Sequence, residues 1–252
     1  MRGRRVAVSI PRRLMIDLLH VARRAPVTVA QVRMSLAPLI AARASAQVHV
    51  SWSAIFARAY GLAAAEMPEL RRFYTTFPWP HFYQLEVSVG QIAVERFIDG
   101  EPAVLGILIK DPATRQLPEI SRFLADAMAA PVDTVKDFQR AIGIARLPLP
   151  VRRLVWWIGM TFGRQRANYL GTFAISSIAH LGADLALTWS PCPVLLSYAT
   201  AGDTGEVDVR LMFDHRCFDG ATAARVLSRL EDLLLGRIVD ELGRVPADAA
   251  DE

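Results

Sequence analysis

The spacing of apolar residues along the chain predicts helices that alternate with short strands. In several stretches apolar side chains recur every three or four positions, which is the spacing of a helix with one buried face. Ser, Asp and Pro residues stand near the ends of these stretches, where they cap or terminate helices. The predicted helices are Ile10–Arg24, Ser35–Ala44, Ser51–Ala65, Pro118–Ala129 and Asp219–Leu235.

Runs rich in β-branched residues predict strands between these helices. Asp99 and Gly100 favour a tight turn between two of the strands, so we expect a hairpin there. The runs at 171–177 and 193–200 lack alternation, which indicates strands buried on both faces. The predicted strands are Val27–Met34, Leu85–Val94, Ala103–Lys110, Gly171–Ser177, Pro193–Thr200 and Glu206–Phe213.

Two segments are less regular. Thr75–Tyr83 carries two prolines and four aromatic residues, which favours a loop that lines a site. Arg146–Arg166 holds a run of about ten apolar or small residues flanked by arginines, too short to cross a bilayer. We expect a helix whose apolar face packs on the core and whose arginines face water. The alternative is an amphipathic segment that contacts a membrane surface.

Composition favours a single folded unit. No internal repeat or flexible linker divides the 252 residues, so we expect one domain over residues 1–243 and a flexible tail at 244–252. Basic residues exceed acidic ones by 29 to 25, and nearly all of the excess is arginine. Such patches can meet nucleic acid, acidic lipid or cofactor phosphates. Since no nucleic-acid motif accompanies them, we do not expect nucleic-acid binding.

The two cysteines, Cys192 and Cys217, are too few for a disulfide framework and lack the paired spacing of a zinc site. We therefore expect no metal and a reducing compartment. The N-terminus lacks the apolar stretch of a secretory leader, and no run is long enough for a membrane span. The expected location is the cytoplasm.

The run FDHRCFDG carries the chemistry, because it places His215 between a predicted strand and a predicted helix. An imidazole has an unperturbed pKa of about 6.5, so it can take a proton from a hydroxyl or thiol near neutral pH. We expect Asp219 to cap the following helix and to pair with an arginine, and Gly220 to allow close backbone approach. An HxxxD match also arises by chance, and a purely structural histidine is the alternative.

The remaining histidines outside the aromatic segment, His20, His49 and His180, are expected to be structural or solvated.

The longer stretch DHRCFDGATAARVLSRLEDLL resembles the C-terminal motif of the acyltransferase component of 2-oxoacid dehydrogenase complexes. GTFAISSIAHLGA and SPCPVLLSYA are similar to two further strands of that family. A looser similarity extends to 10–26 and to the helix before MPELRRFY. Chloramphenicol acetyltransferase shares the fold and the HxxxDG core. The resemblance implies an α/β fold of the chloramphenicol acetyltransferase type, a two-layer α+β sandwich with a mixed central sheet flanked by helices, assembled as a homotrimer.

The resemblance also implies an acyltransferase whose active sites lie at subunit interfaces. His215 would be the general base, and Ser176 of the neighbouring chain would donate to the oxyanion of the tetrahedral intermediate. Ser176, rather than Ser177, matches the family position. Asp219 would belong to the same catalytic motif. The residues expected to have structural roles at the site are Gly220, Arg216 and Arg12, with either arginine as the partner of Asp219.

The chain departs from the dehydrogenase component because no lipoyl domain or Ala/Pro-rich linker is present. The expected donor is therefore a free coenzyme A thioester, with an acyl carrier protein as the alternative. The aromatic segment has no clear counterpart in that family, and Trp79, His81 and Phe82 within it are candidates for substrate binding. Other hypotheses are a lipid-directed acyltransferase, with lipid contact through 146–166, and a trimeric scaffold without catalytic activity.

Overall fold

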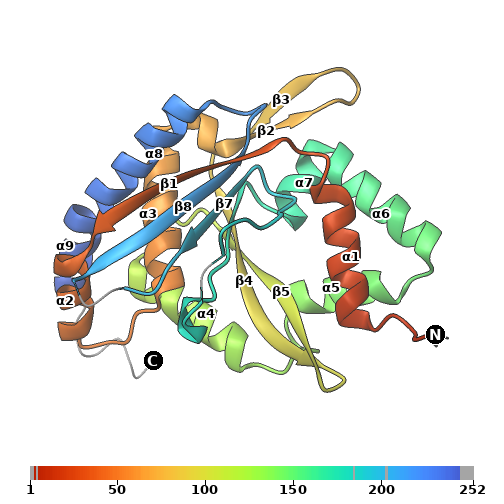
Figure 1. The fold of residues 1–252 in the computed structure, drawn as a ribbon, viewed down its shortest axis with the longest axis horizontal. Coiled ribbons are helices and arrows are strands. Elements are labelled where there is room, and N and C mark those ends of the chain that lie inside the picture. The colour runs from red at the N-terminus through yellow and green to blue at the C-terminus, as the bar shows by residue number, and fades with distance from the viewer. Residues whose placement is uncertain (1–2, 4, 184, 202–203, 245–252) are drawn as a thin grey trace.

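A six-stranded mixed sheet forms the centre of the molecule (Figure 1). The computed structural model describes residues 3, 5–183, 185–201 and 204–244, so the predicted tail lies outside the described residues except for Arg244. Strand order is β1-β8-β7-β6-β4-β5, with β4, β6 and β7 parallel and the other neighbours antiparallel. The expected mixed sheet is confirmed. Its strands are β1 (Val27–Ser35), β4 (Val89–Ile98), β5 (Glu101–Lys110), β6 (Phe173–Ile175), β7 (Val194–Tyr198) and β8 (Glu206–Asp214).

Helices cover the two faces of this sheet differently. One face packs against α3, α4 and α8, while α1 and α5 lie over the β5 end of the other face (Figure 1). Helix α6 packs against α1 and α5, and α7 packs against α6. Alternate residues of β5 serve the two layers, because Leu105 and Ile107 enter the main core whereas Val104 and Leu108 face α1 and α5. The helices are α1 (Ile10–Ala22), α2 (Ala37–Ser45), α3 (Trp52–Glu66), α4 (Leu117–Ala129), α5 (Lys136–Arg146), α6 (Leu149–Thr161), α7 (Gly163–Tyr169), α8 (Gly220–Leu233) and α9 (Val239–Gly243).

The central helix α3 is apolar around most of its circumference and lies deep in the core, as its sequence predicts. Two of its aromatic rings stack on sheet residues: Phe56 on Tyr198, with centroids 4.4 Å apart, and Tyr60 on Phe173, with centroids 4.0 Å apart. Burying a side chain of this size stabilises the fold by about 1.5–3 kcal/mol. These contacts fix β6 and β7, and therefore the positions of the loops that follow them.

Local signals place several element ends where the sequence predicts them. Asp99 and Gly100 both have positive φ, 52° and 79°, as a two-residue hairpin turn between β4 and β5 requires. The hydroxyl of Ser51 accepts a hydrogen bond from the Ala54 N–H (3.2 Å) and caps α3. Both β6 and β7 are buried along their whole length, which confirms the interpretation of their unalternating sequences.

Some predicted boundaries are wrong. The aromatic segment is not simply a loop: β2 (Arg72–Thr75) and β3 (His81–Gln84) pair as a hairpin, and Pro78 and Pro80 fall in the connection, where no ladder hydrogen bond is lost. Ser35 ends β1 rather than beginning a helix. The first hairpin strand, predicted at 85–94, runs from Val89 to Ile98.

The segment 146–166 also differs from its prediction. It spans the end of α5, all of α6 and half of α7, and α6 does not turn its apolar face to the core. Arg152 is the one buried residue of α6, because it enters an ion pair with the buried Asp17 of α1 (3.0 Å). The exposed residues of α6 include Leu149, Leu154 and Trp157. Across the described residues, no helix combines the length and the apolar character needed to cross a membrane.

Candidate active site

The last sheet strand, β8, carries His215 to the edge of the molecule. The preceding residue, Asp214, is buried and accepts hydrogen bonds from the backbone N–H of Arg216 (3.0 Å) and from its guanidinium (2.6 Å). On the other side, the His215 N–H donates to the carbonyl of Pro26 (3.0 Å). The exposed imidazole lies beside the ring of Phe213, with centroids 5.7 Å apart. The backbone of His215 is therefore fixed while its side chain remains accessible.

Asp219 caps α8, as the sequence predicts. Its carboxylate accepts a hydrogen bond from the Thr222 N–H (2.8 Å), and this bond lowers the pKa of Asp219 below its ordinary value. The predicted arginine partners are wrong within the described residues, since Arg216 pairs with Asp214 and Arg12 lies 3.5 Å from Glu101. Asp214 is closer in sequence to Arg216 and buried, so it offers the stronger electrostatic partner.

Ser176 and Ser177 follow β6 and differ in what their hydroxyls do. The Ser177 hydroxyl donates to the carbonyl of Tyr198 (2.7 Å) and accepts from the Ala179 N–H (3.2 Å), so it holds the chain locally. The half-buried Ser176 is tied by its backbone N–H to Leu196 (3.1 Å), and its hydroxyl forms no hydrogen bond to any residue that the structure describes. The Ser176 hydroxyl is therefore available to a ligand.

His215 and Ser176 do not meet within one chain. Strand register places Ile175 beside Leu196 and Leu196 beside Leu211, so Ser176 lies level with Arg210, five residues from His215. At about 3.3 Å per residue and about 4.8 Å per strand spacing, the offset is roughly 17 Å along the strands and roughly 10 Å across them. A reaction that uses both side chains therefore requires two chains.

Ser176 lines a large groove of about 730 Å³. Its walls include Trp52, Phe56 and Tyr198. Arg43 lies at this groove, where its guanidinium stands 5.1 Å from the centre of the Trp52 ring. The groove thus combines apolar walls with the positive charge of Arg43 and the negative charge of Glu95.

The predicted substrate-binding residues lie on the β2–β3 hairpin. Trp79, at the tip, is 68% exposed, His81 hydrogen bonds through its ring nitrogen to the Trp79 carbonyl (2.7 Å), and Phe82 lies under the Arg72 guanidinium at 4.6 Å. Arg72 also donates to the carbonyl of Cys217 (2.8 Å). The hairpin base therefore contacts the His215 turn, while the three side chains stay outside the Ser176 groove.

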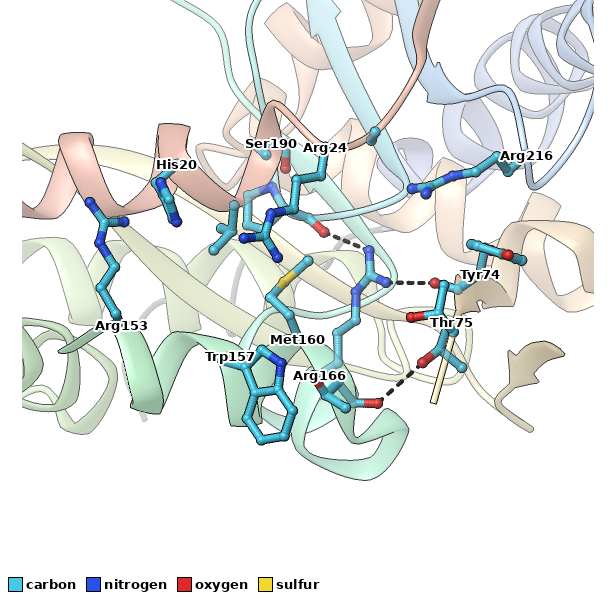
Figure 2. Close-up of a pocket in the computed structure, with 16 residues that line it drawn as sticks. His20, Arg24, Tyr74, Thr75, Arg153, Trp157, Met160, Arg166, Ser190 and Arg216 are labelled. Carbon is cyan, nitrogen blue, oxygen red and sulfur yellow. Dashed lines mark hydrogen bonds between the residues drawn. The ribbon is translucent and has the colours of Figure 1, made fainter. Parts of the chain in front are cut away.

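A second cavity, of about 240 Å³, lies beside the His215 turn (Figure 2). It is lined by His20 of α1, Arg24 of the turn that follows α1, Arg153 of α6, Arg166 of α7 and Arg216 of the turn after β8. Desolvation and the positive charges of Arg153, Arg23 and Arg24 lower the pKa of His20. Sequence reasoning noted the excess of arginine but missed the cavity, because its residues come from five separate segments of the chain.

Comparison with solved structures identifies the fold. Dihydrolipoamide acetyltransferase from Azotobacter vinelandii matches with a TM-score of 0.67 and 18% identity over 94% of each chain. A truncated catalytic core of the 2-oxoacid dehydrogenase multienzyme complex from Thermoplasma acidophilum matches with a TM-score of 0.66 and 18% identity over 93% of this chain and 99% of that one. Chloramphenicol acetyltransferase matches with a TM-score of 0.52 and 14% identity over 88% and 94%. No protein-family model and no curated protein matches the sequence. The chain therefore has the fold shared by the catalytic cores of dihydrolipoamide acetyltransferases and by chloramphenicol acetyltransferase.

Proposed function

We propose that the protein is an acyltransferase that moves an acyl group from a thioester, an acyl-CoA, to a hydroxyl or thiol of an acceptor. The observation that carries the proposal is the exposed His215, fixed by Asp214 and Pro26 at the end of β8 in a fold shared with acyltransferases. In the Azotobacter vinelandii enzyme, a serine, a histidine and an asparagine were investigated for roles in the catalytic mechanism. Ser176, His215 and Asp219 are the residues proposed here for the corresponding roles.

The chemistry follows from the two side chains. His215 takes the proton of the acceptor hydroxyl or thiol, and the acceptor atom forms a bond to the thioester carbonyl carbon. The carbonyl oxygen becomes an oxyanion, to which the Ser176 hydroxyl donates a hydrogen bond. When the carbon–sulfur bond breaks, the thiolate leaves and takes up the proton held by His215. The products are an acylated acceptor and free coenzyme A.

The separation of His215 and Ser176 supports a homotrimer in which the site is shared between neighbouring chains. Residues 1–243 would form one catalytic unit, and the Ser176 groove would hold the donor, with Arg43 near its phosphates. We place the protein in the cytoplasm because Cys192 and Cys217 are both buried free thiols.

The proposal is tested by thiol release from acyl-CoAs of increasing chain length, supplied with a pool of alcohols and thiols. We expect release with the wild-type protein and loss of most of it in His215→Ala, with unchanged melting temperature showing that the variant is folded. If no donor is consumed by the wild-type protein, the trimeric scaffold without catalytic activity becomes the better account. The same assay is repeated with an acyl carrier protein as the acyl donor, and release of its thiol is measured.

The exposed face of α6 favours a lipid as the acceptor. Leu149, Leu154 and Trp157 are 53%, 55% and 49% exposed, and arginines flank the helix, as in helices that lie on anionic membranes. Phe162 extends this surface toward the hairpin, with its ring centre 5.5 Å from that of Phe77. Sedimentation with anionic phosphatidylglycerol vesicles tests this candidate: Leu154→Ser with Trp157→Ser is expected to abolish vesicle binding by the wild-type protein.

A further inference from the structure

The cavity beside the His215 turn is strongly cationic. Figure 2 shows the guanidinium groups of Arg24, Arg166 and Arg216 around the same space, with Arg153, on α6, reaching toward His20, on α1. No aspartate or glutamate lines the cavity among the residues that the structure describes. At about 240 Å³ its volume is several times the roughly 30 Å³ that one water occupies, so a phosphate or carboxylate group fits.

The charges around the cavity are only partly balanced. Arg216 is paired with Asp214 (2.6 Å), and Arg153 lies 3.5 Å from Asp17, which Arg152 also approaches at 3.0 Å. Arg24 and Arg166, by contrast, are not within ion-pair distance of any carboxylate in the part of the chain that is described. The cavity therefore carries an excess of positive charge.

Arg166 is a buried cation at this cavity. Its side chain is buried, with 5% exposed, and two of its guanidinium nitrogens donate to the carbonyls of Tyr74 (3.0 Å) and Pro191 (2.9 Å). Its Nε is buried and has no hydrogen-bond partner among the described residues. Burial lowers the pKa of Arg166 because the charged guanidinium is desolvated. Its neighbours are the two carbonyls and the ring of Phe73, whose centre lies 4.5 Å away, and none of these carries a full negative charge. An anion in the cavity would offset this desolvation.

We propose that this cavity binds an oxyanion, a phosphate or carboxylate, carried by the acyl acceptor. The assignment to the acceptor rests on the proposed function and on position. Arg216 directly follows His215, and Ala25 precedes Pro26, whose carbonyl binds the His215 N–H. An anion held here would place the rest of its molecule beside the proposed general base, away from the Ser176 groove of the same chain.

The side chains also indicate how the anion is held. Guanidinium groups offer paired N–H donors that match the oxygens of phosphate and carboxylate, so Arg24 can bind such a group through two N–H groups. Arg216 already binds Asp214 through its Nε and Nη2, so it would contribute only its remaining N–H groups and its charge. Trp157 and Met160 form an apolar wall next to these donors. The Thr75 hydroxyl already donates to the Thr161 carbonyl (3.2 Å), so the arginines remain the principal ligands.

Calorimetric titration with inorganic phosphate tests the site without requiring catalysis. The wild-type protein is expected to bind phosphate, and Arg24→Gln and Arg153→Gln are each expected to weaken binding about tenfold. Arg24 is exposed, so its variant keeps the fold. Arg237→Gln is the matched control and should bind like wild type, because it removes an equal charge from an exposed arginine that does not line the cavity and whose partner, Glu241, keeps its ion pair with Arg58. Equal phosphate affinity in wild type and both cavity variants would overturn the proposal.

A second titration separates acceptor from donor. With saturating coenzyme A present, phosphate affinity should be unchanged if the cavity serves the acceptor. If coenzyme A instead competes with phosphate, and this competition is lost in Arg24→Gln, the assignment to the acceptor is overturned. The cavity would then bind a phosphate group of the donor. The His215→Ala variant should bind phosphate normally, so failure of the proposed acyl transfer and failure of this site give different results.

Discussion

A mixed trimer of two inactive variants tests whether the active site is shared between chains. His215→Ala removes the proposed base, and Ser176→Ala removes the proposed oxyanion donor. Because the two residues lie roughly 20 Å apart in one chain, a working pair must combine His215 of one chain with Ser176 of the next. Each homotrimer of a single variant therefore has three defective sites, whereas a trimer that contains both variants has one intact site.

The expected magnitudes follow from this arrangement. Loss of one oxyanion donor lowers the rate by about 10²–10³-fold, and loss of a general base lowers it by about 10²–10⁴-fold. Both parent variants should thus show about 1% of wild-type activity or less. A cyclic trimer with both variants has one complete site among three, so its activity should be about one third of wild type. The mixture should exceed either parent about thirtyfold.

Coexpression with two different affinity tags, followed by purification on both, isolates the mixed trimers. Thiol release is then compared with that of each parent and of wild type at equal protein concentration. If the doubly tagged trimers show only the average of their parents, no site combines His215 of one chain with Ser176 of the next, and the interface argument is refuted.

Three further predictions concern cysteine reactivity and stability. Burial raises the pKa of both Cys192 and Cys217 to about 11. Neither thiol should therefore react with a thiol reagent at pH 8 in the native protein, and both should react when the protein is unfolded. Rapid labelling of the native protein would contradict the burial of these thiols. Asp17→Asn leaves Arg152 buried without its counter-charge and should lower the free energy of unfolding by about 3–5 kcal/mol in urea titrations. A loss below about 1 kcal/mol would show that this ion pair does not stabilise the fold. Gly61→Ala places a Cβ 2.7 Å from Pro112 and should lower the free energy of unfolding by about 1–3 kcal/mol. Gly143→Ala is at an exposed helical position with no neighbour within 4 Å, so it should raise the free energy of unfolding by about 0.5–1 kcal/mol. Equal effects of the two substitutions would contradict the packing around Gly61.

Features set by neighbouring residues were predictable from the sequence. The Asp99–Gly100 turn, the Ser51 cap and the Asp219 cap each depend on side chains within three positions, and all three occur as predicted. The buried strands β6 and β7 were predictable because a strand without polar alternation has no face for water. These elements position His215 and Ser176.

Features set by distant contacts were not predictable. The apolar run in α6 indicated a core-facing helix, but the pairing of Arg152 with Asp17 of α1 turns its apolar residues outward. Periodicity gives the faces of a helix but not which of them is buried. The partner of Arg216 was mistaken for a similar reason, since Asp214 and Asp219 are both near in sequence and only the fold shows that Asp214 is buried beside it.

The fate of an isotope-labelled acyl group tests the central claim most directly. An acyl-CoA carrying a ¹³C-labelled acyl group is incubated with the protein and a cell extract, and the products are separated and weighed by mass spectrometry. The account predicts labelled ester or thioester on an acceptor that carries a phosphate or carboxylate group with wild type, and none above the background of the extract with His215→Ala. Label recovered only as free acid would show a thioesterase, and label remaining on the donor in both samples would contradict acyl transfer by this fold.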